Sequence, residues 1–364
     1  MKTAVVIGTG LVGTSVALAL TRRGVLVLLE DRDVDAARTA ASLGAGTLLA
    51  AEGPGQPADL AVLAVPPAHV AAALASAQAR GLARCYTDVC SVKAGPVADA
   101  DARGLDTAAY IGGHPLAGRE KSGPLAARAD LFEGRPWVLT PTERTGRDTL
   151  NRALELVSLC GSVPVVMDPA EHDRAVALIS HAPHLVSALM AARLEHAGED
   201  AARIAGQGVR DVTRIAAGDP ALWQEILSAN AGAVADVLQE YAGDLEAVIG
   251  ALRALAEKGA ELAPEAGGEL VERLRRGNAG VARIPGKHGA PRAAYAPVPV
   301  VISDAPGELA RLFAAAGAAG VNIEDLTIEH SPGQPVGHVT LYVDPDAAPA
   351  LSERLAERGW TVQA

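Results

Sequence analysis

The stretch "TAVVIGTGLVGTSVALAL", residues 3–20, reads as a β-strand, a glycine turn and a helix in immediate succession. Its apolar, β-branched run ends at Gly8, and Gly10 and Gly13 complete the spacing G-x-G-x-x-G. The first glycine permits a tight turn, the second lets the backbone approach a pyrophosphate, and the third lets the helix pack closely on the strand. The stretch therefore predicts a dinucleotide-binding β-α unit.

The next apolar strand supplies the acid that such a unit needs. Residues 25–33, "VLVLLEDRD", carry Asp31 about 20 residues beyond the glycines, where a ribose-binding carboxylate belongs. Asp31 favours NAD, because its carboxylate accepts from the ribose 2′-hydroxyl and repels a 2′-phosphate, whereas Arg32 beside it opposes that preference. The N–H groups of Leu11 and Val12, at the start of the helix, are expected to face the phosphates.

Short apolar strands and helices continue to alternate beyond this unit. Further strands are predicted over residues 59–67, 83–93, 136–141 and 163–168. Strands separated by helices form a parallel, doubly wound sheet of the Rossmann type, in which ligands bind beyond the carboxyl ends of the strands. His114, in "GGHPLAG", is expected just past one of these ends, on the cofactor side of the sheet.

The distribution of residue types along the chain predicts four successive regions. Residues 1–167 form the nucleotide-binding domain, and residues 168–283, rich in Ala, Leu and Val, form an all-α domain whose surplus apolar faces indicate subunit contacts. A linker rich in proline and glycine covers residues 284–295. Residues 296–364 read as strand, helix, two strands, helix and strand, which is the ferredoxin-like βαββαβ order.

Composition narrows the class of protein. The 364 residues are 49% apolar and 21% charged, which indicates a folded protein of several domains. The net charge of -11 argues against a nucleic acid or an anionic membrane as the main partner. No apolar run is expected to reach the roughly 18 residues of a membrane-spanning helix. The three cysteines have no CxxC or zinc spacing, so we expect reduced thiols in a cytoplasmic protein.

Five motifs occur in an order that is similar to one enzyme family. They are "GTGLVGTS", "DVCSVK", "GGHPLAGREKSG", "HDRAVALISHAPH" and "VRDVTRIAAGDPALW". In this order, over residues 2–283, they resemble the prephenate/arogenate dehydrogenases of tyrosine biosynthesis. The last segment, with "SDAPGELARLF" and "GVNIEDL", resembles an ACT domain, a small module that often binds amino acids.

The resemblance implies a homodimeric, NAD-dependent prephenate dehydrogenase, which oxidatively decarboxylates prephenate to 4-hydroxyphenylpyruvate. His114 matches the catalytic base of the family, and an imidazole with an ordinary pKa of about 6.5 can accept the substrate's hydroxyl proton at neutral pH. Ser91, in "DVCSVK", matches the serine that lies between the nicotinamide and that hydroxyl. Lys93 ranks below Ser91, as a group that neutralises nearby carboxylates.

Three further residues are assigned to the substrate through the resemblance. His181 matches a histidine that contacts the substrate. Arg214 matches the arginine that grips the ring carboxylate, which a guanidinium binds through two parallel hydrogen bonds. Glu120 takes the place of a glutamate that contributes to a gate over the site.

A metal held by His172, His181 and His184 is the other interpretation of these histidines. Pro183 disrupts their common helical face, and neither an HExxH motif nor a cysteine pair supports metal binding. We therefore expect no metal, and a structural role for His184.

The ACT-like segment is expected to bind tyrosine, the pathway end-product. Gly307 opens a helix whose exposed N–H groups suit a carboxylate, with Asp304 in the same turn and Asn322 before the next strand. A dimerisation appendage without a ligand is the alternative.

Three other functions stay open at this point. Arogenate differs from prephenate only in its side-chain amino group, and no residue pattern separates the two substrates. A β-hydroxyacid type of dehydrogenase would place a catalytic lysine in the helical region, but residues 168–257 contain none. A non-catalytic regulator that senses NAD and an amino acid would not need His114, Ser91, His181 and Arg214 together.

Overall fold

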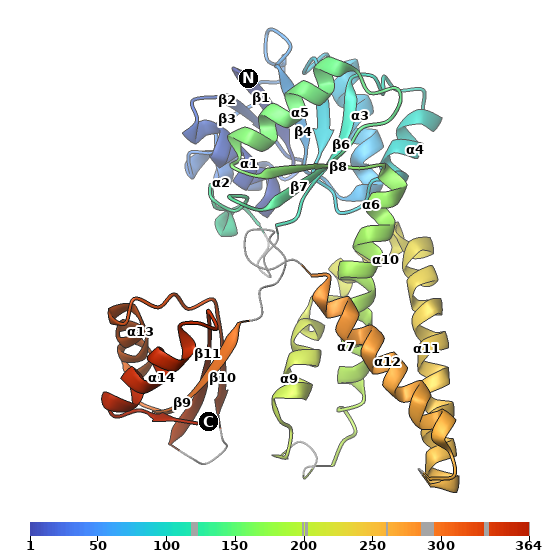
Figure 1. Cartoon of the computed structure of the whole chain (residues 1–364). Helices are drawn as coiled ribbons and strands as arrows, with labels where there is room; N and C mark the ends of the chain where they lie inside the picture. Colours follow the sequence, from blue (N-terminus) through green and yellow to red (C-terminus); the bar gives the residue numbers. More distant parts are fainter. Residues whose placement is uncertain are drawn as a thin grey trace. The chain divides into compact units, whose positions relative to one another are not determined.

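The computed structural model divides into two compact units, Met1–Tyr241 and Ala242–Ala364 (Figure 1). It describes residues 1–117, 123–198, 200, 203–259, 261–284, 295–330 and 335–363. The segment 285–294, which holds most of the predicted linker, lies outside the described residues.

An eight-stranded sheet forms the centre of the first unit. Its order is β3-β2-β1-β4-β5-β6-β7-β8, so the chain reverses direction across the sheet between β1 and β4, as doubly wound folds do. The strands are β1 (Thr3–Ile7), β2 (Leu26–Glu30), β3 (Thr47–Leu48), β4 (Leu60–Leu63), β5 (Tyr86–Asp88), β6 (Tyr110–Pro115), β7 (Pro136–Thr140) and β8 (Val163–Val166).

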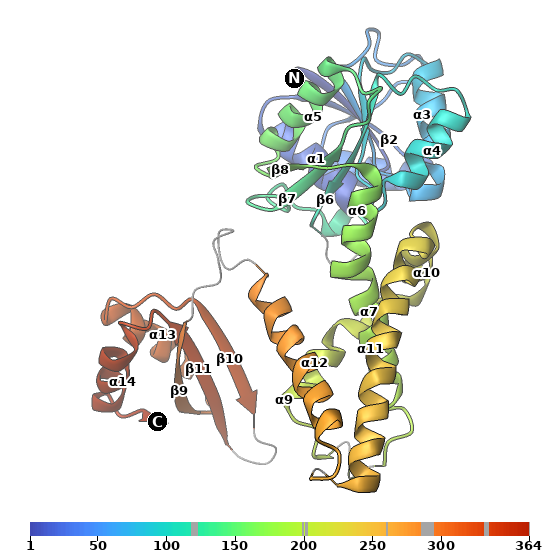
Figure 2. The ribbon, with the colours of Figure 1, turned by 45° about the vertical axis from the view of Figure 1, so that its right-hand side comes forward.

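Helices cover both faces of this sheet (Figure 2). Val16 and Leu20 of α1 (Leu11–Arg22) share one apolar core with Leu156 of α5 (Arg147–Leu159). The opposite face is covered by α3 (Val70–Ala79) and α4 (Ala94–Ala102), which contribute to a second apolar core. Helix α2 (Val34–Ser42) adds Ala40 to the core of α1 and α5, and it begins at Asp33, whose side chain accepts from two backbone N–H groups of the first turn. The predicted three-layer Rossmann arrangement is thus present.

The sheet is not parallel throughout, which corrects the prediction. β6 and β7 pair antiparallel, with His114 opposite Val138, whereas the other pairs of this sheet are parallel. A parallel pair requires a crossover, usually a helix of a dozen or more residues. Between β6 and β7 the described residues hold only the three-residue 3-10 helix η2 (Pro124–Ala126), so the chain returns in the opposite direction.

A helical arm leaves the sheet through α6 (Pro169–Val176) and continues into α7 (Ala182–Ala192) (Figure 1). Asp168 caps α6 by accepting from the N–H groups of Ala170 and Glu171. The chain then continues through α9 (Gln207–Thr213), the 3-10 turn η4 (Arg214–Ala217), α10 (Pro220–Ala229), α11 (Ala231–Lys258), within which the second unit begins, and α12 (Pro264–Ala282). The helical stretch Pro169–Ala192 is interrupted between α6 and α7.

The interruption between α6 and α7 is a π-helical segment, Ala177–His181. Pro183 follows it and has no N–H to donate to the carbonyl of Ile179, and its ring clashes with that carbonyl in a regular helix. A wider π turn relieves this conflict, and such turns are frequent at functional sites. It also reorients His181, because residues nine apart, such as His172 and His181, point to opposite faces of a regular helix that turns about 100° per residue.

The run Pro169–Ala192 corrects the expectation that no apolar stretch reaches the length of a membrane span. It has 24 residues and a mean hydropathy of 1.5, which meets that criterion by length and composition only. However, it carries His172, Asp173 and His181, which are buried and hydrogen-bonded within the first unit. These contacts tie the polar residues of the run into the first unit, although only 33% of the run's apolar window is buried.

The second unit contains a four-stranded sheet of order β10-β11-β9-β12. Its elements follow as β9 (Ala296–Ser303), α13 (Glu308–Ala318), β10 (Asp325–His330), β11 (Val336–Val343), α14 (Ala348–Glu357) and β12 (Thr361–Val362). The three strand pairings are antiparallel, and both helices add buried leucines to the apolar core under the sheet. The predicted order of strands and helices is present.

Candidate active site

The glycine turn after β1 has the shape that a dinucleotide requires. Gly8 has φ +99°, and a Cβ on it would lie 2.2 Å from the carbonyl oxygen of Ala64. A Cβ on Gly13 would lie 2.0 Å from the oxygen of Gly8. Gly10 has no atom within 4 Å of its Cβ position and leaves α1 without a side-chain cap, so the N–H groups of Leu11 and Val12 begin an open helix end. These residues fit a bound NAD pyrophosphate.

Asp31 follows β2 directly and fixes the same turn. Its Oδ2 accepts from the backbone N–H of Thr9 at 2.6 Å and from the Thr9 hydroxyl at 2.9 Å, while its Oδ1 accepts from the N–H of Asp33. An ionised carboxylate has about four acceptor sites, so Asp31 retains capacity for one further donor. Asp31 therefore holds the glycine turn in addition to the cofactor role predicted for it.

A pocket of about 640 Å³ lies on this edge of the sheet. Its walls come from the segments after β2, β4 and β5 and from helix α10. The lining side chains are Arg32, Pro66, Pro67, Ala68, His69, Val92, Pro96, Asp99, Ala221, Gln224, Glu225, Ser228 and Ala229, with the backbone of Gly95. Segments that follow parallel strands carry ligand sites in such sheets. The pocket is lined by Arg32, next to Asp31, but not by Asp31 or by the glycines of the turn.

His114 is the penultimate residue of β6, not a residue beyond the strand as predicted. Gly112 and Gly113 precede it at a point where the backbones are crowded. A Cβ on Gly113 would lie 2.6 Å from the carbonyl oxygen of Asp88, and a Cβ on Gly112 would lie 2.5 Å from Oγ1 of Thr140. The two glycines thus let β5, β7 and Lys93, on the segment after β5, pack closely against the strand that carries His114.

His114 is half-buried and begins a row of hydrogen-bonded side chains that continues into the buried His172 and Asp173. Its Nδ1 lies 2.9 Å from Nε2 of His172, and Nδ1 of His172 lies 2.8 Å from Oδ1 of Asp173. The two rings meet edge to face, with centroids 5.1 Å apart. His172 and Asp173 were not predicted as site residues, although their adjacency in the first turns of α6 was visible as "HD" in a matched motif.

Burial holds the pKa of His114 well below its ordinary value, and positive charge on Lys93, His172 and His181 acts in the same direction. His114 is therefore neutral at neutral pH, as a base must be before it accepts a proton.

Lys93 lies beneath His114 in a fully buried ion pair with Asp88. Its Nζ also donates to the carbonyl of Gly113 at 2.7 Å, and the hydroxyl of Tyr110 donates to Oδ2 of Asp88 at 2.6 Å. Burial raises the pKa of Tyr110, with the Asp88 charge as the next cause. Lys93 thus neutralises a carboxylate, as predicted, and also fastens β5 to the end of β6.

His181 is 2% exposed and is oriented by Asn230, which follows α10. Nδ2 of Asn230 donates to the carbonyl of Asp173 at 2.8 Å and lies 3.1 Å from Nδ1 of His181. Nδ2 of Asn230 can donate its second hydrogen to Nδ1 of His181 only if that nitrogen carries no proton. Neutral His181 therefore carries its proton on Nε2. Burial lowers the pKa of His181 and so favours this neutral form.

His184 is held against Trp223, with parallel rings and centroids 3.6 Å apart. Its pKa is lowered by burial, and the backbone of Ile215 acts in the opposite direction. These contacts tie α7 to the turn that carries Arg214, which is a structural role of the kind predicted for His184.

Ser91 lies half-buried between β5 and α4, on the segment that closes against His114. Its neighbour Cys90 is buried, and its Sγ lies 3.0 Å from the carbonyl oxygen of Val65. Burial raises the pKa of Cys90 far above the range of a reactive thiol. Cys90 is therefore a packing residue beside Ser91.

Among the described residues, the hydrogen bonds around the histidines do not include Arg214. Arg214 is exposed in η4, and within the described part of the chain it has no hydrogen bond or ion pair. Glu120 lies outside the described residues. Among the side chains that are described, no group of three or more His, Cys, Asp and Glu is arranged to hold a metal ion.

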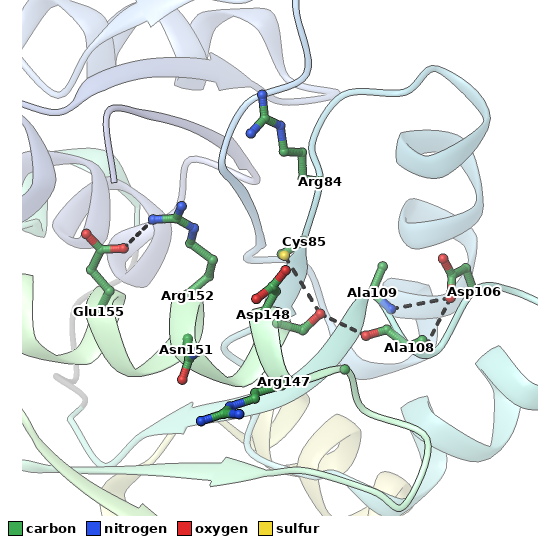
Figure 3. Close-up of a pocket in the computed structure, with 12 residues that line it drawn as sticks. Arg84, Cys85, Asp106, Ala108, Ala109, Arg147, Asp148, Asn151, Arg152 and Glu155 are labelled. Carbon is green, nitrogen blue, oxygen red and sulfur yellow. Dashed lines mark hydrogen bonds and ion pairs between the residues drawn. The ribbon is translucent and has the colours of Figure 1, made fainter.

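A larger pocket, of about 770 Å³, lies near the amino ends of β5 and β6 (Figure 3). Arg84, Arg147 and Arg152 line it, but their guanidinium groups do not converge, and Arg152 is paired with Glu155 (Figure 3). Asp106 and Asp148 balance the remaining charge. The dinucleotide turn and His114 are both at the other ends of the strands, so this pocket is not the candidate active site.

Comparison with known proteins identifies the family. Residues 16–166 match the nucleotide-binding domain of prephenate dehydrogenase, and residues 168–273 match its dimerization domain. The chain belongs to the prephenate dehydrogenase family. As a member it is an NAD-dependent oxidoreductase, which confirms the cofactor and the enzyme class expected from the sequence.

Relatives and solved structures show the same family relationship. The chain is 46% identical to the probable prephenate dehydrogenase NovF of Streptomyces niveus over 362 residues, 99% of each chain. It is 31% identical to the prephenate dehydrogenase of Bacillus subtilis over 253 residues, 66% of this chain and 67% of the relative.

Two crystal structures share the fold. Synechocystis arogenate dehydrogenase is 28% identical with a TM-score of 0.62, and the match covers 74% of this chain and 99% of the other. Prephenate dehydrogenase from A. aeolicus, in complex with hydroxyphenyl propionate and NAD+, is 26% identical with a TM-score of 0.62, covering 76% and 98%.

Proposed function

We propose that the chain oxidises and decarboxylates prephenate to 4-hydroxyphenylpyruvate, with His114 as the base. The observation that carries this proposal is a half-buried, neutral His114 near the carboxyl end of a central strand, in the sheet that holds the dinucleotide turn. Bound NAD+ supplies the hydride acceptor for carbon 4 of the ring. Gly8, Gly10, Leu11, Val12 and Gly13 hold its pyrophosphate, and Asp31 its ribose.

In the proposed reaction His114 acts first as a base and then as an acid. Its Nε2 takes the proton of the substrate's 4-hydroxyl while the hydride leaves carbon 4. When carbon dioxide departs, the electron pair of the broken carbon–carbon bond enters the ring, and the ring oxygen takes a proton back. The overall reaction releases no net proton, so His114 needs only to hold one transiently.

The other side chains bind and orient the substrate in this proposal. His181 donates from Nε2 to a substrate oxygen, because Asn230 occupies its Nδ1. Ser91 contacts the 4-hydroxyl beside the nicotinamide. Arg214 binds the ring carboxylate through a bidentate pair, and Glu120 belongs to the gate.

Initial rates of NADH formation with prephenate and with arogenate test this function. We expect a clear preference for prephenate. A preference for arogenate would reassign the substrate within the family. Protein that binds NAD but reduces it with neither substrate would favour the non-catalytic regulator.

The first prediction concerns pH. Because burial and the charge of Lys93 hold the pKa of His114 well below 6.5, His114 stays unprotonated as the pH falls from neutrality to that value. We expect kcat/KM to be flat across this range and to fall only at lower pH, as His114 becomes protonated. An acid limb centred at or above pH 6.5 would contradict the assignment.

The second prediction concerns cofactor choice. Asp31→Asn removes the negative charge but keeps an acceptor for Thr9, so the ratio of kcat/KM with NAD to that with NADP should fall. Thr9→Val is the matched control, since it breaks the hydroxyl bond to Asp31 and keeps the charge. Equal use of NAD and NADP by the unmodified protein would show that Arg32, not Asp31, governs the choice.

We also propose that the chain acts as a cytoplasmic homodimer. Large apolar side chains on the helical arm support this: Leu178 is 60% exposed, Ile179 64% and Leu189 61%. A single chain rarely leaves so many apolar groups in water, and the family match names this region a dimerization domain.

Residues 296–364 are proposed to be an ACT domain that binds tyrosine. The element order and the antiparallel sheet β10-β11-β9-β12 support a ferredoxin-like plan. Gly307, with φ +92°, opens α13 without a side-chain cap, and Asp304 lies in the same turn. The amide of Asn322 donates to Glu324, so this bond has to open if Asn322 is to reach a ligand.

The third prediction separates regulation from product mimicry. Tyrosine should inhibit the full-length protein, and a form truncated after Arg283 should stay active but lose most of that inhibition. Kinetic titration of both forms with tyrosine makes the comparison. Equal inhibition of the two forms would place tyrosine at the active site and remove the regulatory role.

A further inference from the structure

We infer that His172 and Asp173 are positioning residues that hold His114 in the tautomer with its proton on Nδ1 and accept that proton during turnover. The inference rests on the proposed role of His114 as the base. Its evidence is the row of contacts from Nδ1 of His114 to His172, at 2.9 Å, and from His172 to Asp173, at 2.8 Å, of which the second is fully buried.

The order of donors along this row follows from Asp173. An ionised carboxylate only accepts, so the His172 nitrogen beside it, Nδ1, carries a proton. Neutral His172 then has an unprotonated Nε2, which requires a donor from His114. The proton of neutral His114 therefore lies on Nδ1, and its Nε2 has a free lone pair. Among the described residues no hydrogen bond engages that Nε2, so it is available to the substrate hydroxyl.

Asp173 is itself fixed as an acceptor from three directions. Its Oδ1 accepts from the backbone N–H of Lys93 at 2.7 Å as well as from His172, and its Oδ2 accepts from the N–H of Ala94 at 2.8 Å. Asn230 donates to the carbonyl of the same residue. These bonds fasten α6 to the start of α4, so the carboxylate cannot turn away from His172.

His172 and Asp173 can also accommodate the positive charge that arises when His114 takes the substrate's proton. When Nε2 of His114 takes the hydroxyl proton, the Nδ1 proton can pass to Nε2 of His172, and the positive charge then lies beside the carboxylate of Asp173. Charge left on His114 alone would be disfavoured by burial and by Lys93. The transfer reverses when the ring oxygen is reprotonated, so no path to solvent is needed.

Two substitutions of His172 test the inference, because they should lower kcat to different extents. His172→Leu removes the acceptor, and kcat with prephenate should fall by about 10²–10⁴-fold, the range of a lost general base. His172→Gln places an amide oxygen where Nε2 was, so it should retain at least about tenfold more kcat than His172→Leu. NAD affinity should be unchanged in both.

Nitrogen-15 NMR of the histidine rings provides a readout that lost stability would not move. In the unmodified full chain the proton of His114 should be on Nδ1, and in His172→Leu it should shift toward Nε2. Leu156→Ala, in the core between α1 and α5, is the control that lowers stability and leaves this tautomer unchanged.

Each outcome decides the inference. A parental tautomer with the proton on Nε2, or parental kcat in His172→Leu, would overturn it. If His172→Leu does not fold, the parental tautomer and His172→Gln still decide. If the unmodified protein does not turn over prephenate, the proposed function is wrong. The tautomer measurement would still show whether His172 and Asp173 set the protonation of His114.

Discussion

His114→Asn is expected to lower kcat with prephenate by about 10²–10⁴-fold, because it removes the general base. The asparagine side chain reaches only as far as Nδ1 of the imidazole, so it keeps a polar contact to His172 and loses the nitrogen that faces the substrate. The binding of NAD should be nearly unchanged, since no contact joins His114 to the glycine turn. Steady-state rates and a titration of NAD binding measure the two effects.

His196→Asn is the matched control, because His196 is exposed and belongs to no part of the proposed site. It should have parental rates. Near-normal kcat in His114→Asn would mean that another group removes the proton, and the neutral, Asn230-bound His181 would be the next candidate.

Arg214→Ala is expected to raise KM for prephenate more strongly than any other substitution outside the histidines. It removes a bidentate, charge-assisted contact to the ring carboxylate, of the kind worth about 1.5–3 kcal/mol, which corresponds to roughly 10–100-fold in affinity. Arg214→Lys keeps the charge and loses the paired geometry, so its KM should lie between those of the parent and Arg214→Ala.

Arg210→Ala is the control, since Arg210 is an exposed arginine one helical turn earlier, in α9. Titration calorimetry with prephenate measures binding directly. Parental binding in both Arg214 variants would place the carboxylate site elsewhere. A loss confined to Arg210→Ala would transfer the role to that residue.

Much of the fold was predictable because its signals are local. A side chain at Gly8 or Gly13 would clash with neighbouring backbone atoms, so both positions require glycine. Strands β1, β2 and β4 are short apolar runs that can be recognised in the sequence. The antiparallel β7 was not predictable in this way. Its direction depends on how the chain returns from β6, and the strand itself reads like its parallel neighbours.

The site was predictable only in part, for a related reason. Motifs single out His114 and His181 as residues, but not the contacts that set their protonation. His172 looked like an ordinary first-turn histidine, and its role depends on a strand 58 positions away in sequence. The π turn before Pro183, which reorients His181, also has no signal in the periodicity of apolar residues.

The central claim is most directly tested by the stoichiometry of one reaction. The unmodified protein is mixed with NAD+ and a limiting amount of prephenate, and NADH and carbon dioxide are both measured at completion. The account predicts that the two products appear in equal amounts, each equal to the prephenate consumed, and that His114→Asn forms neither at a comparable rate. NADH without carbon dioxide, carbon dioxide without NADH, or neither product from the unmodified protein would contradict it.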